Sequence, residues 1–225
     1  MPQTDYEKYI RTDELFALLR PRSDLVTHDE LLFQVTHQTA ELWMQVILHD
    51  VADGVRLLDE DKLGPALDRF TRAAMIEAHL ARQLEILETM PPKSYEKIRP
   101  TLGKGSGQES PGFNSLLRMG DTIWPSLSRL LERRQVAIVD VLDDPVAHDE
   151  LHRLFRSLYE LDQWFRTWRF GHFRLVERQI GAFVKSLKGA PAELLVHGMR
   201  EHLLPELWEA VNAFTQRVNA RLGKG

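Results

Sequence analysis

Two histidines of this chain stand at positions where helical spacing predicts apolar neighbours. In LLFQVTHQTAELWMQ, His37 shares one helical face with Phe33 and Met44. In QWFRTWRFGHFRLVERQIG, His172 falls beside Phe165 on a second helical wheel. An imidazole among apolar side chains needs partners for its donor and its acceptor, since an unpaired buried polar group costs roughly 1–3 kcal/mol. Each histidine therefore predicts either an internal hydrogen bond or a bound ligand.

The residues alone leave two interpretations of this pair open. Each can be a core histidine bonded to a backbone carbonyl or a water molecule, or the two can face a cofactor, because helical bundles build cofactor sites from facing helices. A separate pair in HDELH (148–152) has the spacing of a zinc-binding helix, but aspartate replaces the glutamate of H-E-x-x-H and the flanks are polar. We expect the remaining histidines to matter less: His28, His49, His79, His148, His152, His197 and His202.

Composition excludes several other kinds of chemistry. The 225 residues include no cysteine, which rules out disulfide frameworks, thiolate nucleophiles and cysteine-based metal sites. The formal net charge is -4 and the pI is about 6.1, so no basic surface is expected for nucleic acid or an anionic membrane. The N-terminus lacks a signal-peptide pattern, and no apolar run approaches the roughly 20 residues of a membrane span. We expect a soluble, cytoplasmic protein with small-molecule partners.

Helices must hold these side chains in place, since Leu, Ala, Glu and Arg recur at helical spacing and alternating β-branched runs are nearly absent. The sequence predicts one all-α domain over 1–225. Its expected helices are 12–19, 28–60, 65–89, 93–99, 113–142, 146–187 and 191–221. Pro125 and Pro205 fall inside these patterns and predict kinks or breaks. Pro100 predicts that Arg99 leaves the helical backbone conformation.

Four sequence blocks, in order along the chain, resemble the tryptophan 2,3-dioxygenase family of haem proteins. They are YEKYIRTD (6–13), HDELLFQVTHQTAELW (28–43), LETMPPKSYEKIR (87–99) and WRFGHFR (168–174). The second block is the most specific, and together the blocks span most of the chain. The resemblance implies a helical bundle with a haem pocket between long helices. It also implies a homotetramer that opens the indole ring of tryptophan with O2 to give N-formylkynurenine.

The same resemblance implies roles for individual residues. His172 would be the proximal ligand of the haem b iron, and His37 a catalytic residue that hydrogen-bonds the indole N–H on the distal side. Arg99 would pair with the substrate carboxylate, because its planar guanidinium group can bond two oxygens at once. The implied substrate-binding residues are Phe33, His37, Tyr95, Arg99 and Gly112, together with Tyr6, Tyr9 and Ile10 of the segment 1–11, which in the family reaches a neighbouring subunit's site.

Two departures from the family pattern keep other activities open. The family has a Gly-Thr-Gly-Gly type loop that helps to hold the amino-acid end of the substrate, and the corresponding stretch IGAFVKSLKGAPAELL (180–195) lacks it. The family's S-G-F-Q-S block becomes SPGFNSLLR (110–118), in which Arg118 comes one position early. A haem-dependent monooxygenase of a modified indole or aromatic amino acid is therefore a second hypothesis. A non-catalytic helical haem-binding protein is a third.

Overall fold

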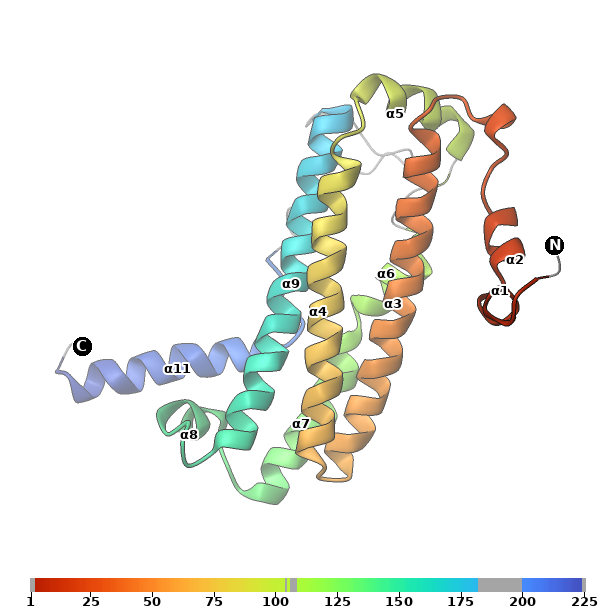
Figure 1. Cartoon of the computed structure of the whole chain (residues 1–225). Coiled ribbons are helices and arrows are strands. Elements are labelled where there is room, and N and C mark those ends of the chain that lie inside the picture. The colour runs from red at the N-terminus through yellow and green to blue at the C-terminus, as the bar shows by residue number, and fades with distance from the viewer. Residues whose placement is uncertain (1–2, 104, 106–108, 182–199, 224–225) are drawn as a thin grey trace.

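The structure is a computed structural model that describes residues 3–103, 105, 109–181 and 200–223, and every regular element in these ranges is a helix (Figure 1). The helices are α1 (Asp5–Ile10), α2 (Thr12–Ala17), η1 (Arg22–Asp24), α3 (Glu30–Asp59), α4 (Leu63–Leu87), α5 (Pro92–Ile98), η2 (Arg99–Leu102), α6 (Pro111–Leu116), α7 (Met119–Arg134), α8 (Ile138–Asp143), α9 (Asp149–Ile180) and α11 (Pro205–Arg221). The all-α prediction is confirmed. None of these helices is both long enough and apolar enough to cross a membrane.

Helix α4 packs against both α3 and α9 (Figure 1). Its contacts therefore fix which turns of α3 and α9 lie at the same level along the bundle axis. The α3–α4 pair is antiparallel, and the side chain of Gln83 on α4 donates to the hydroxyl of Thr39 on α3. Helix α9 runs parallel to α4, and Leu84 of α4 lies against Gly171 of α9. These neighbouring contacts place the α3 turn near residue 39 and the α9 turn near residue 171 beside the same turn of α4.

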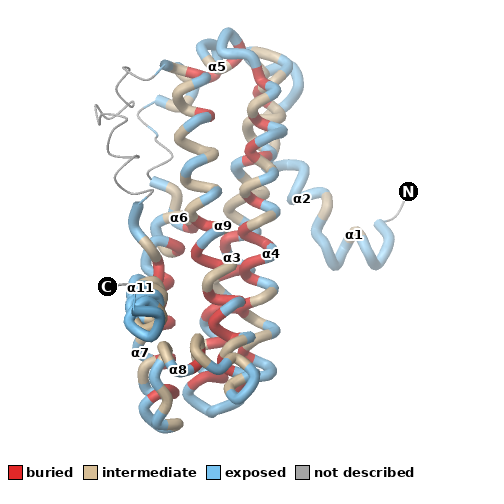
Figure 2. The backbone as a smooth tube through the Cα atoms, turned by 90° about the vertical axis from the view of Figure 1, so that its left-hand side faces the viewer, coloured by how far each residue is buried: buried red, intermediate tan, exposed pale blue. Residues whose placement is uncertain are grey.

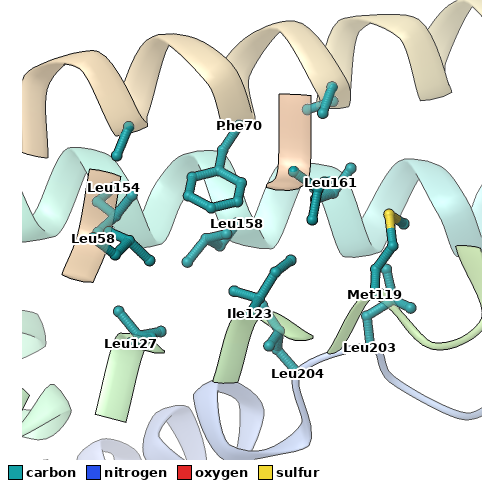
Figure 3. Close-up of a cluster of buried hydrophobic side chains, with 14 of the residues drawn as sticks. Leu58, Phe70, Met119, Ile123, Leu127, Leu154, Leu158, Leu161, Leu203 and Leu204 are labelled. Carbon is teal, nitrogen blue, oxygen red and sulfur yellow. The ribbon is translucent and has the colours of Figure 1, made fainter. Parts of the chain in front are cut away.

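The hydrophobic core has two parts. In the larger part, shown in Figure 3, Phe70 of α4, Leu158 of α9 and Ile123 of α7 are fully buried together. Burying each such side chain contributes roughly 1.5–3 kcal/mol. The smaller cluster lies at the end of the bundle that α5 covers, and consists of Leu84, Leu87, Met90, Ile98 and Leu175. Figure 2 shows the buried positions along the inner faces of the long helices.

Two helix boundaries differ from the sequence prediction for physical reasons. The expected helix 113–142 is divided among α6, α7 and α8. Arg118 leaves the helical conformation between α6 and α7 (φ −105°, ψ 7°), and Gln135 adopts a left-handed backbone conformation (φ 52°) that ends α7. Pro205 begins α11 instead of breaking it, since a residue in the first turn needs no partner for its N–H. Pro125 lies inside α7, which continues through it.

Other differences concern the ends of the chain. Helix α1 is absent from the predicted helices because it has no buried apolar face, and a capping box begins it: the Thr4 hydroxyl accepts from the Glu7 N–H (3.2 Å), and the Glu7 carboxylate accepts from the Thr4 N–H (2.6 Å). Parts of the expected helices 146–187 and 191–221 fall on 182–199, which lie outside the described residues.

The C-terminal helix α11 is fastened to α9 and α7 just before it begins. The buried carboxylate of Asp162 accepts hydrogen bonds from the Leu203 N–H (3.1 Å), from His202 Nδ1 (3.0 Å) and from the Trp208 indole N–H. Gly120 of α7 gives the crossing its space, because a Cβ there would lie 1.7 Å from the Leu203 carbonyl oxygen. His202 therefore helps to anchor α11 to the bundle.

Candidate functional site

His37 on α3 and His172 on α9 lie at the same height of the bundle, on the two helices that flank α4. Their imidazoles are close enough to interact electrostatically. Burial lowers the pKa of His172 most, and repulsion from His37 lowers it further. The structure thus brings together the two histidines that the sequence pattern selects.

The His37 ring is held in one tautomer by its own helix. Its Nδ1 lies 2.7 Å from the carbonyl oxygen of Phe33, and since a carbonyl only accepts, Nδ1 carries the proton and donates. The ring also packs on Phe33, with the two ring centroids 4.1 Å apart. Burial lowers the pKa of His37 below 6.5, although the Phe33 carbonyl and Glu41 act to raise it. The neutral ring then has a lone pair on Nε2 that can accept a hydrogen bond from a ligand N–H.

The space beside His37 is open to solvent although protein atoms surround the ring. The solvent-accessible area of His37 classes it as exposed, yet the main cause of its lowered pKa is desolvation by the protein atoms around the ring. His172 is likewise partly accessible and strongly desolvated. Both histidines are therefore accessible to solvent in part while protein atoms surround them closely enough to lower their pKa values.

Stacking fixes the plane of the His172 ring. Trp168, one turn earlier on α9, lies almost parallel to it, with an interplanar angle of 8° and ring centroids 5.3 Å apart. Burial lowers the pKa of His172 to about 4, so the ring is unprotonated at neutral pH, which is the state that ligates a metal. Porphyrin iron needs a single protein ligand on its proximal side. One neutral, oriented imidazole therefore fits the role that the resemblance to haem proteins implies.

Helix α5 is held across this end of the bundle by contacts at both sides. The Ser94 hydroxyl donates to the carboxylate of Asp29, just before α3, at 2.6 Å. On the other side, the Gln179 side-chain amide of α9 donates to the carbonyl of Met90 at 2.8 Å. Because these contacts tie α5 to both α3 and α9, side chains on α5 have fixed positions relative to the two histidines.

Tyr95 on α5 and Arg99 at its C-terminal end lie one helical turn apart. The Tyr95 ring centroid is 6.1 Å from that of Phe33, and burial raises the pKa of Tyr95 while Arg99 acts to lower it. Arg99 keeps a helical backbone (φ −49°, ψ −44°), so the expectation that Pro100 would displace it is wrong. Pro100 lies in the first turn of η2, where its missing N–H interrupts no hydrogen bond, and the steric preference of a residue before proline is overridden by the continuing helix.

Gly112 lies buried where α6 contacts α3. Its N–H donates to Glu41 Oε2 at 3.0 Å. A Cβ at this position would lie 2.7 Å from the same oxygen and 2.9 Å from Met44 Sδ. Gly112 therefore allows α6 to sit closely on α3, and its contact with a substrate stays a prediction.

The N-terminal residues of the predicted site lie apart from the others. Tyr6, Tyr9 and Ile10 on α1 are 68%, 90% and 40% exposed. Helices α1 and α2 project away from the bundle (Figures 1 and 2). One copy of the chain does not bring these side chains to its own histidines, so their predicted role requires a neighbouring copy.

Three residues that shape the site are missed by the sequence interpretation: Glu41, Phe113 and Trp168. Trp168 precedes His172 by one turn and Glu41 follows His37 by one turn, so helical spacing offers a signal for both. Phe113 contacts Trp168 from another helix, with ring centroids 5.1 Å apart, and no local pattern predicts that contact.

Two other sequence features lie elsewhere. Within the described ranges, no three histidine or carboxylate side chains converge on a point where a metal ion could bind, the HDELH stretch included. The stretch 180–195, where the family's threonine loop is lacking, lies outside the described residues from position 182 onward.

Comparison with known proteins gives consistent matches. The sequence model described as tryptophan 2,3-dioxygenase matches residues 1–122. Proteins named tryptophan 2,3-dioxygenase are similar to this chain: that of Erythrobacter litoralis is 28% identical, covering 90% of this chain and 95% of the relative, and that of Ruegeria pomeroyi is 30% identical, covering 90% of each. That of Myxococcus xanthus is 34% identical over 76% of this chain and 55% of its own length.

Proposed function

This chain belongs to the tryptophan 2,3-dioxygenase family, and from that premise we propose that it is a haem-dependent dioxygenase of L-tryptophan or a close derivative. The reaction inserts both atoms of O2 across the indole C2–C3 bond and gives an N-formylkynurenine-type product. The observation that supports it most is the pair of neutral imidazoles of His37 and His172 at one height of the bundle, within electrostatic range of each other.

In this proposal His172 holds haem b through the iron. Its low pKa keeps the ring unprotonated, and the parallel Trp168 ring limits its rotation. Bound haem would supply the activation of O2, which amino-acid side chains cannot perform. The remaining work of the protein is to bind the substrate, to orient it and to exclude water.

His37 orients the indole ring. Because Nδ1 already donates to the Phe33 carbonyl, Nε2 is the nitrogen that can accept the indole N–H. The Phe33 ring, packed against His37 and near Tyr95, offers an apolar wall for a flat aromatic substrate. Holding the ring in one orientation lowers the barrier because the reacting atoms no longer have to find each other.

Arg99 binds the carboxylate of the amino acid. It is partly buried on the same cover as Tyr95, and a partly desolvated guanidinium group pairs strongly with a carboxylate. The proposed site thus has an apolar part near His37 and a cationic part at Arg99, which matches the two ends of tryptophan.

The enzyme is proposed to be a cytoplasmic homotetramer of single-domain chains (1–225), in which the segment 1–11 of one copy completes the site of a neighbour. The exposure of Tyr6, Tyr9 and Ile10 supports this arrangement. Co-expression of a copy lacking 1–11 with a His172→Ala copy, which is expected to hold no haem, is expected to restore turnover that neither variant has alone, because mixed oligomers then contain one complete site. Equally low turnover in mixed oligomers, separated by their tags, would show that the segment acts within its own chain.

The reaction is tested by loading the protein with haem, reducing it without oxygen, and adding tryptophan and then labelled O2. The expected product is N-formylkynurenine with two labelled oxygen atoms, measured by absorbance and mass spectrometry. One labelled atom would indicate the monooxygenase alternative. Haem binding without a ring-opened product from any indole tested would leave the non-catalytic haem-binding protein.

Replacing His37 with alanine is expected to leave haem content unchanged and to weaken tryptophan binding. The loss of one neutral hydrogen bond corresponds to between about twofold and tenfold in affinity. Binding by the wild-type protein should weaken only at pH values below 6.5, since protonation of Nε2 removes the acceptor and burial lowers the pKa. His49→Ala, on an exposed position of the same helix, is the control. Loss of haem from the His37→Ala protein would contradict the assignment of the two histidines.

A further inference from the structure

Helix α6 connects the two sides of the site, and the carboxylate of Glu41 binds its start. Glu41 lies one turn after His37 on α3. Its Oε1 accepts from the hydroxyl of Ser110, and its Oε2 accepts from the N–H of Gly112 at 3.0 Å. The same Ser110 hydroxyl accepts from the Phe113 N–H at 3.0 Å and so caps α6. The carboxylate therefore binds the start of α6 through a side chain and through the backbone.

The contact between α6 and α3 leaves no free space. Gly112 is buried, and a Cβ on it would overlap both Glu41 Oε2 and Met44 Sδ. Two hydrogen bonds to one carboxylate together with this close packing fix the start of α6 along α3 as well as its distance from α3. The position of the next residue, Phe113, is fixed as a consequence.

Phe113 connects α6 to α9 through aromatic contacts. Its ring centroid lies 5.1 Å from that of Trp168 and 6.0 Å from that of Phe165. Trp168 in turn stacks on His172 with an interplanar angle of 8°. A continuous set of contacts thus runs from the carboxylate beside His37, through α6, to the aromatic ring that orients His172.

We propose that Glu41 is a positioning residue: by holding α6 on α3 it seats Phe113 against Trp168 and thereby sets the orientation of the His172 imidazole relative to His37. The consequence for a bound haem rests on the proposed function, but the packing itself does not. In the haem protein, Glu41 then governs the geometry of the proximal ligand from the distal helix.

The first experiment compares three variants in the haem-loaded protein. Glu41→Ala removes both hydrogen bonds, and Phe113→Leu leaves them intact but removes the aromatic contact with Trp168. Both variants are expected to shift the iron–imidazole stretching band in resonance Raman spectra and to speed haem release by about tenfold, which corresponds to about 1.4 kcal/mol. Their kcat for tryptophan should fall more than their KM rises, because both variants keep the side chains of His37 and Phe33 on α3 and the hydrogen bond between them.

The control is Asp59→Ala. Asp59 lies at the other end of α3 and binds Ser126 and Arg129 of α7 in a similar way, with Oδ1 and Oδ2 as acceptors. Its loss should lower stability without changing the haem spectrum. If Phe113→Leu keeps the wild-type Raman band and haem release rate, or if Asp59→Ala shifts them as much as Glu41→Ala does, the proposal is overturned.

A second readout does not depend on haem. In the haem-free protein the ring current of the stacked Trp168 should displace the carbon-bound proton resonances of His172, which can be assigned by their absence in His172→Ala. Glu41→Ala and Phe113→Leu should move these resonances toward ordinary positions, and Asp59→Ala should not. Unmoved resonances in both test variants would contradict the positioning role of Glu41. A wild-type protein that fails to bind haem would instead contradict the proposed function and leave this result intact.

Discussion

A His172→Ala variant is expected to fold and to show no Soret band on addition of haem, whereas the wild-type protein is expected to show one. The reason is that the proposed haem has a single protein ligand, so removing this imidazole removes the iron–protein bond. The cavity left beside Trp168 should admit free imidazole, since a free imidazole ring can stack on Trp168 as the His172 ring does. Added imidazole is therefore expected to restore a Soret band.

The measurement is a haem titration followed by absorbance, with circular dichroism to confirm that the variant is folded. His152→Ala on the same helix is the matched control, because His152 lies near the opposite end of α9 from His172. Haem affinity of the His172→Ala protein equal to that of wild type would remove His172 from the ligand role. It would also remove the basis for the proposed dioxygenase mechanism.

The long helices could be predicted from the sequence because their apolar faces repeat over many turns. The predicted ranges 28–60 and 65–89 agree closely with α3 (Glu30–Asp59) and α4 (Leu63–Leu87). The segment around Gln135 could not be predicted in the same way, since the apolar period continues across it while one left-handed residue changes the direction of the chain. Breaks of this kind depend on a single backbone conformation and not on composition.

The candidate site was predictable to the extent that its residues carry local signals. His37 and His172 stand out because each is a polar residue on an apolar helical face. The contact between Glu41 and Ser110 joins residues that are 69 positions apart, and neither residue type nor spacing singles it out. The structure is needed to show that α6 connects the two histidine helices, and the role predicted for Tyr6 and Tyr9 requires a neighbouring copy of the chain.

Glu77 of α4 gives the second large expected effect, on the pH dependence of stability, because its carboxyl group lies buried in the bundle with no hydrogen-bond partner among the described residues. Burial raises the pKa of Glu77 from 4.5 to about 8, so the folded protein holds it protonated at neutral pH. In the unfolded chain the same group loses its proton near pH 4.5.

The free energy of unfolding should therefore fall as the pH rises from 4.5 to about 8, since the folded state binds the extra proton throughout this range. The contribution of Glu77 is of order 1 kcal/mol per pH unit in this window. Urea unfolding at pH 5 to 8 is expected to show that Glu77→Gln loses this fall, and that Glu77→Leu is more stable than wild type by roughly several kcal/mol at pH 8.

His172 has the opposite effect in the acidic part of this range. Its pKa is lowered in the folded state from 6.5 to about 4, so its contribution to stability increases as the pH rises from 4 to 6.5. This effect is common to wild type and the Glu77 variants, and it cancels when their unfolding free energies are subtracted. Glu85→Gln, at an exposed position of α4, should retain the wild-type slope. If the unfolding free energies of wild type and Glu77→Gln change in parallel with pH, the carboxylate of Glu77 has a partner or water in the folded protein and is ionised there.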